Sequence, residues 1–184
     1  MSSVVTTRAG KGSALTNNEL DANFAPSWHC IKLATDCVNA TTTPATISDG
    51  AAGATNIFTY TPAANTDFEI EVELLVQAVT TANLPLISVA VPAGYQYGTV
   101  EIIHQSTATG YVNNMLGFTT TAVTPTMVAG TAVSATVPFR VQILIKGRAG
   151  ATPSAITIRG AGETAAAAAC TVKAGSVMRY RTIT

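Results

Sequence analysis

Hydrophobic and polar residues alternate most regularly from Phe68 to Val79. Hydrophobic side chains fall on the even positions, whereas Glu69, Glu71 and Glu73 fall on odd positions. Because successive side chains of a strand point to opposite faces of a sheet, this alternation predicts a half-buried strand with a wet, acidic outer face. Twelve residues is long for a strand. We therefore expect a central or bent strand that spans the whole domain.

Shorter hydrophobic runs separated by Gly, Pro and Asn follow the same pattern on either side of this segment. They predict strands over residues 57–60, 87–91, 100–105, 111–121, 137–146, 155–159, 169–173 and 176–183. The last two meet at Ala174-Gly175, which predicts a two-residue hairpin turn. With eight or nine strands and no convincing helix after residue 25, the chain is expected to be all-β. The spacing favours a β-sandwich of the jelly-roll type.

The region before residue 57 has a different character. Trp28 to Val38 is interpreted as an edge strand or a linker packed on the main domain. Residues 39–55 are rich in Thr, Gly and Ala and resemble a series of turns. We place the boundary between an N-terminal arm (1–50) and the sandwich body (51–184) inside this stretch.

One short helix is predicted within the arm. Thr16 and Glu19 have the spacing of a capping box, and Leu15 and Leu20 have that of a hydrophobic staple. Leu20 and Phe24 lie one turn apart, and Pro26 ends the element. A helix of about two turns does not persist alone in water. Its Leu20/Phe24 face therefore requires a partner.

The run from Thr7 to Phe24, TRAGKGSALTNNELDANF, resembles an N-terminal motif of tailed-bacteriophage structural proteins, R-x-G-K-G-x-x-L-T-x-x-E-L-D-x-N-F. That motif opens tail fibres, tailspikes and other virion appendages and helps to seat them on the particle. It spans 18 of the 184 residues here. Residues 172–181 also resemble closing strands of small β-domains in such proteins, less specifically. The resemblance implies a homotrimer whose attachment and trimerisation arm carries Arg8, Lys11, Leu15, Thr16, Glu19, Leu20 and Phe24.

Composition narrows the function classes. Only 11% of the residues are charged although 47% are hydrophobic, so the surface is either covered by other subunits or an ordinary Thr-rich β surface. Ten basic and ten acidic residues cancel, which gives nucleic-acid binding little electrostatic support. Neither a membrane span nor a secretory signal is expected, so we expect folding in a cytosol with Cys30, Cys37 and Cys170 as free thiols.

Candidate chemistry is sparse. His29 and Cys30 are neighbours with Asp36 and Cys37 close by, but adjacent strand residues face opposite ways, so no metal site is expected. His104 is interpreted as a structural or interface histidine, since no nucleophile motif accompanies it. The glutamate row could serve glycoside hydrolysis, but a solvated or ion-paired row is favoured. Cations available for pairing, within the chain or across a subunit boundary, are Arg140, Lys146, Arg159, Arg179 and Arg181.

Tyrosines supply the remaining binding candidates. Tyr95 and Tyr97 flank Gln96 after a Pro-Ala-Gly loop, and Tyr111 lies further on. As exposed groups in loops they would form a receptor or interface surface that could include sugar contacts, although ordinary loop packing is the favoured interpretation.

These observations favour a non-enzymatic virion structural protein that needs no cofactor. The leading hypothesis is a trimeric capsid decoration (cement) protein that contacts the major capsid protein on the outer surface of the virion and is assembled in the host cytoplasm. The alternative is a tail fibre or receptor-binding knob attached to tail or baseplate proteins. An enzyme acting on host polysaccharide is the third and least favoured hypothesis.

Overall fold

The computed structural model describes residues 28–50, 55–78, 84–105, 111–128, 137–163 and 170–183. It contains thirteen strands in these segments and no helix. The strands are β1 (His29–Lys32), β2 (Cys37–Asn39), β3 (Ala45–Thr46), β4 (Thr59–Tyr60), β5 (Asp67–Gln77), β6 (Pro85–Ala90), β7 (Tyr95–Gln105), β8 (Tyr111–Phe118), β9 (Thr126–Val128), β10 (Phe139–Ala149), β11 (Ile156–Gly162), β12 (Cys170–Val172) and β13 (Val177–Ile183).

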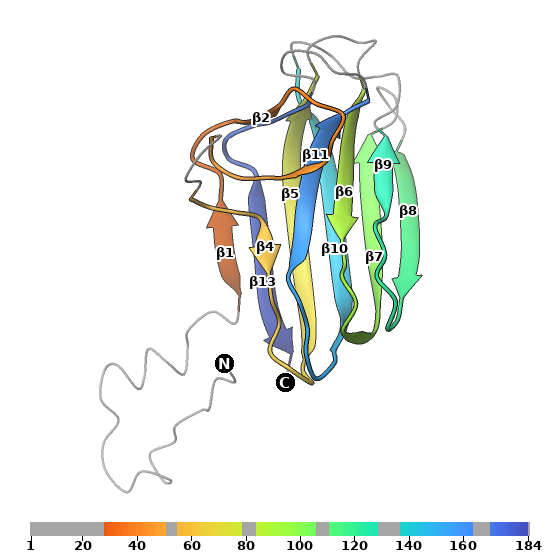
Figure 1. Ribbon diagram of the computed structural model, residues 1–184. Coiled ribbons are helices and arrows are strands. Elements are labelled where there is room, and N and C mark those ends of the chain that lie inside the picture. The colour runs from red at the N-terminus through yellow and green to blue at the C-terminus, as the bar shows by residue number, and fades with distance from the viewer. Residues whose placement is uncertain are drawn as a thin grey trace, which may run out of the picture.

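Two sheets face each other to form a sandwich (Figure 1). The larger sheet has the order β1-β13-β5-β10-β7-β8, with β12 and β2 attached beside β5. The smaller sheet, in front in Figure 1, has the order β3-β11-β6-β9, with β4 paired to β11. The predicted all-β sandwich is confirmed. The predicted helix over residues 16–25 lies outside the described residues.

Strand β5 is the long central strand that the alternation predicted. It pairs with β10 on one side and with β13 and β12 on the other. The side chains of its inner face are all buried in the core between the sheets, and they are those of Phe68, Ile70, Val72, Leu74, Val76 and Ala78. Hydrophobic burial at alternate positions therefore fixes the register of β5, because a shift by one residue would expose all of them.

The expected hairpin between the last two strands is wrong. Strands β12 and β13 do not pair with each other, and both lie along β5. Between these two strands the regular pairing with β5 is interrupted. There the Ser176 hydroxyl accepts a hydrogen bond from Leu75 N at 3.0 Å, and Lys173 N donates one to Leu75 O at 2.8 Å. Gly175 supplies a positive φ of 92° at this point. The Ala174-Gly175 turn is thus a local interruption between two strands, β12 and β13, that pair with the same side of β5.

Residues 28–50 contribute strands to both sheets. β1 is the edge strand of the larger sheet beside β13, β2 pairs with β12, and β3 pairs with β11. Asp49 ties this region together, because its Oδ1 accepts hydrogen bonds from Ala34 N at 2.8 Å and Thr35 N at 3.0 Å. The sheets therefore begin at His29, before the expected end of the arm.

Aromatic rings cross the core from the β4 side to the β8 side. Tyr60, Phe68, Tyr95 and Phe118 follow one another with ring centroids 6.3, 5.6 and 5.8 Å apart. The Phe118 ring fills the space above Gly98, where an added Cβ would lie 2.1 Å from Phe118 Cζ. Phe118 is consequently the anchor that holds the end of β8 in the core.

Candidate functional site

The outer face of the larger sheet carries most of the charged candidates. Glu69 lies on this face but only 5% of its side chain is exposed. Lys146 Nζ of β10 lies 2.7 Å from Glu69 Oε1, and Arg181 of β13 contacts Oε2 through Nη2 at 2.6 Å and Nε at 3.0 Å. The Arg181 guanidinium also packs on the Trp28 ring, 4.4 Å from its centroid. Four side chains from separate parts of the chain thus form one cluster.

Burial by itself would raise the pKa of Glu69, but the hydrogen bonds and charges of Lys146 and Arg181 outweigh it and hold the pKa below its ordinary value. Glu69 therefore stays ionised at neutral pH. A general acid in glycoside hydrolysis needs the opposite shift. The expectation of a wet outer face is wrong at this position, because two cations from neighbouring strands cover the carboxylate.

The expected pairing of the glutamate row with cations is confirmed within the chain for three of the five candidates. Besides Lys146 and Arg181, Arg140 Nε lies 3.0 Å from Glu73 Oε1. Arg179 lies opposite Glu71 in the β5–β13 register. Arg159 lies on β11 in the other sheet, away from the glutamates.

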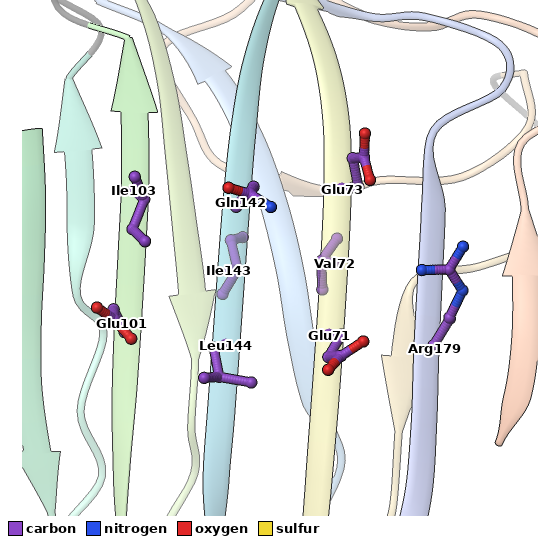
Figure 2. Close-up of a pocket in the computed structure, with 9 residues that line it drawn as sticks. All are labelled: Glu71, Val72, Glu73, Glu101, Ile103, Gln142, Ile143, Leu144 and Arg179. Carbon is purple, nitrogen blue, oxygen red and sulfur yellow. The ribbon is translucent and has the colours of Figure 1, made fainter. Parts of the chain in front are cut away.

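A shallow depression of about 260 Å³ lies in the middle of this face. Figure 2 shows its polar side chains on four neighbouring strands, with Arg179 on the β13 side. Glu73 is paired with Arg140, and Glu101 accepts a hydrogen bond from Asn113 Nδ2 at 2.6 Å. The lining can bind polar groups through charge and hydrogen bonds. Its polar members are Glu71, Glu73, Glu101, Gln142 and Arg179.

The histidines and cysteines do not assemble a reaction centre among the described residues. His104 is buried on the inner face of β7, and its Nδ1 lies 3.4 Å from Gln105 O. His29 stacks on Tyr180 with ring centroids 5.3 Å apart. Cys30, Cys37 and Cys170 are free thiols, and burial raises the pKa of Cys170 to about 12. In the described segments no group of three or more His, Cys, Asp or Glu residues is placed to hold a metal ion. No helix in these segments is long and apolar enough to cross a membrane.

The three candidate tyrosines do not form one surface. Tyr95 is 1% exposed, and its hydroxyl donates to Ser154 O, so the expectation that it is exposed in a loop is wrong. The strand β7 begins at Tyr95 and turns its ring into the core. Tyr97 is 55% exposed and Tyr111 is 70% exposed. Tyr111 pairs with Gln105, eight residues along β7 from Tyr97, so at about 3.3 Å per residue the two lie roughly 26 Å apart.

Strand β8 is a surface that the sequence analysis did not single out. The seven residues from Tyr111 to Gly117 are all exposed, and β8 is the last strand of its sheet. Its hydrophobic members are Tyr111, Val112, Met115 and Leu116. The signal was present in the sequence, because the run YVNNMLGF contains no charged residue.

The arm residues of the motif, Arg8, Lys11, Leu15, Thr16, Glu19, Leu20 and Phe24, lie outside the described residues. Their role in attachment and trimerisation stays a prediction. The first described residue is Trp28, within the expected arm, and its ring packs on the guanidinium of Arg181, which is paired with Glu69.

No protein-family model and no curated protein sequence matches this chain. Among solved structures, a family 16 carbohydrate-binding module is 16% identical with a TM-score of 0.30, over 64% of this chain and 80% of that one. A carbohydrate-binding module of the β-sandwich superfamily is 12% identical with a TM-score of 0.27, over 74% and 55%. A chain from the structure of the infectious bursal disease virus Gt strain is 12% identical with a TM-score of 0.25, over 85% of this chain and 40% of that one. The chain thus spans about half or less of the last two proteins, and likenesses this weak carry no argument about function.

Proposed function

We propose that this chain is a non-enzymatic structural protein of a tailed-phage virion, with a body of the jelly-roll type. Its most favoured role is that of a trimeric capsid decoration protein. The arm would attach to the head shell, and the body would stand on the outer surface. Stabilisation of the shell would then come from area buried between subunits.

The observation that carries this proposal is the motif from Thr7 to Phe24 ahead of a separate sandwich body. Every key position of the phage attachment pattern is matched in that segment. In the body behind it, Glu69 and Glu73 are held in ion pairs, which supports a structural role. The short chain contains neither a shaft repeat nor a long coiled coil, which favours decoration over a fibre.

The location on the particle is tested by electron microscopy of intact virions labelled with an antibody against this protein. We expect label over the whole head with icosahedral regularity. Label confined to the tail would overturn the decoration role.

The second candidate function is a tail fibre or receptor-binding knob. The exposed rings of Tyr97 and Tyr111 favour it, because exposed tyrosines provide rigid amphipathic contact area. A Tyr97→Ala variant distinguishes the two functions. A receptor-binding role predicts loss of adsorption to host cells with the protein still on the particle, whereas a decoration role predicts unchanged adsorption.

A further inference from the structure

Strand β8 projects from the sandwich as an unprotected edge. The exposed fractions are 70% for Tyr111, 38% for Val112, 66% for Met115 and 42% for Leu116. Only Phe118, at the end of the strand, is buried. Among the described strands β8 pairs with β7 alone, so no described strand pairs with its other edge.

Proteins usually protect such an edge with charged side chains, proline or a bulge. β8 has neither charge nor proline, and its register with β7 runs without interruption from Gln105↔Tyr111 to Gly98↔Phe118. The charges of this outer face are concentrated instead on β13, β5 and β10, where they form ion pairs. The exposed edge is therefore the part of the sheet least suited to contact with water.

The side of β8 that faces the core is also uncovered. Val112 and Leu116 lie opposite His104 and Val100 in the register with β7. His104 and Val100 are buried, 4% and 0% exposed, whereas Val112 and Leu116 are not. The core thus ends at β7, and the hydrophobic side chains of the next strand remain open. Hydrophobic side chains left open at the edge of a core are typical of a surface that is buried between subunits.

A second copy of the chain is the occupant that fits this surface. Around a symmetry axis, equivalent residues of the copies meet one another, so any charge there would face a like charge. β8 is uncharged over its whole length and meets this condition.

We infer that β8 lines the threefold axis of the homotrimer, with Tyr111, Val112, Met115 and Leu116 as its apolar centre. This inference rests on the homotrimer of the proposed function. It adds that β8 is the part of the body buried at the threefold axis. The charged central strands of the larger sheet then face solvent.

The first test compares the masses of two full-length variants by light scattering after gel filtration. Met115→Lys should turn the trimer into a monomer with an unchanged circular dichroism spectrum, because Met115 is exposed within a single copy. Ile183→Lys is the matched control, on β13 near the other edge of the same sheet and 41% exposed. This control should remain trimeric.

A second test decides the question if the lysine variant fails to fold or if the arm alone maintains the trimer. Met115→Cys, in a background in which the exposed Cys30 is replaced by serine, is treated with a short bismaleimide. A two-chain product is expected at high dilution, and Ile183→Cys should give none. A trimer without this product would overturn the β8 interface but leave the homotrimer intact. A wild-type monomer would overturn both. If the wild type is a dimer and the Met115→Cys variant still gives the linked product, the threefold arrangement is overturned.

Discussion

At the scale of single residues, Glu69 is a buried carboxylate that two cations, Lys146 and Arg181, hold in place. The Glu69 side chain is only 5% exposed, although its partners Lys146 and Arg181 are 54% and 35% exposed, whereas Glu73 and Arg140 are 44% and 50% exposed. Buried ion pairs are costly to break because the remaining charge keeps its desolvation, whereas exposed pairs contribute little. Glu69 and Glu73, both on β5, therefore allow one kind of interaction to be compared in two environments.

We predict that Glu69→Gln lowers the free energy of unfolding by about 2 kcal/mol, since its cations can turn partly toward water. Glu73→Gln should cost less than about 1 kcal/mol. Urea denaturation of both variants measures the difference. Equal losses would show that burial does not strengthen the Glu69 cluster. Fluorescence of Trp28, the only tryptophan, should change in the Glu69 variant alone because Arg181 is released from its ring.

Titration of His104 makes the free energy of unfolding depend on pH. Burial lowers the pKa of His104 below its ordinary value of 6.5. The unfolded chain therefore binds a proton first as the pH falls below about 6.5, and stability decreases until the pH passes the pKa of the folded state. Hydrogen bonds hold the pKa values of Asp36 and Asp49 below their ordinary values, so their stabilisation is lost only in more acidic solution.

We predict that stability falls between pH 7 and pH 5 by no more than about 1.4 kcal/mol per pH unit from this histidine. His104→Gln should flatten the dependence in this window and leave the loss below pH 4.5 in place, about where ordinary carboxylates titrate. Urea midpoints measured at several pH values provide the check. A variant with the same slope as the wild type would place the titrating group elsewhere.

At the scale of strands, two glycines lie at the contact between β7 and β8, and they differ in how much space surrounds them. A Cβ on Gly98 would lie 2.1 Å from Phe118 Cζ and 2.6 Å from Lys146 O, and the carbonyl belongs to a central strand that cannot move aside. A Cβ on Gly117 would meet only Gly98 O at 3.9 Å, an ordinary contact. The first glycine is required by packing, and the second is not.

We predict that Gly98→Ala destabilises the fold by about 3 kcal/mol, because Phe118 must leave the core or the strands must separate. Gly117→Ala should change stability by less than about 0.5 kcal/mol. Hydrogen exchange should also become faster along β8 in the Gly98 variant, since Phe118 is its anchor. Equal effects of the two substitutions would contradict this account of how β8 is held.

The strands also show which features of the fold the sequence could and could not predict. The period-two pattern of Phe68 to Val79 predicted β5, which runs from Asp67 to Gln77, and its buried face, because burial on one side selects alternate residues. The pattern could not tell which strands pair, so a turn signal at Ala174-Gly175 suggested a hairpin where the chain continues along β5. Tyr95 was misplaced because a Pro-Ala-Gly signal does not say at which residue the strand begins. The β8 surface depended on strand order, which is a tertiary property.

At the scale of the whole molecule, the described residues form one hydrophobic core that extends from β1 to β7 between the two sheets. Buried residues from Leu33 to Met178 form one cluster between the sheets, and the Trp28–Arg181–Glu69 cluster marks where this body begins. Stability of such a unit comes from its own buried area. We therefore expect that residues 7–24 are not needed to fold the body.

We predict that a chain starting at Trp28 still unfolds in one cooperative transition, with a melting temperature within about 5 °C of the full-length protein. The same truncation should abolish binding to particles that lack this protein. A full-length Leu20→Ser/Phe24→Ser variant is the control, since it keeps the length of the arm while removing its apolar pair. Calorimetry and co-sedimentation with the particles measure the two effects. A truncated chain that fails to fold would make the arm part of the domain, and one that still binds would move the attachment site to the sandwich itself.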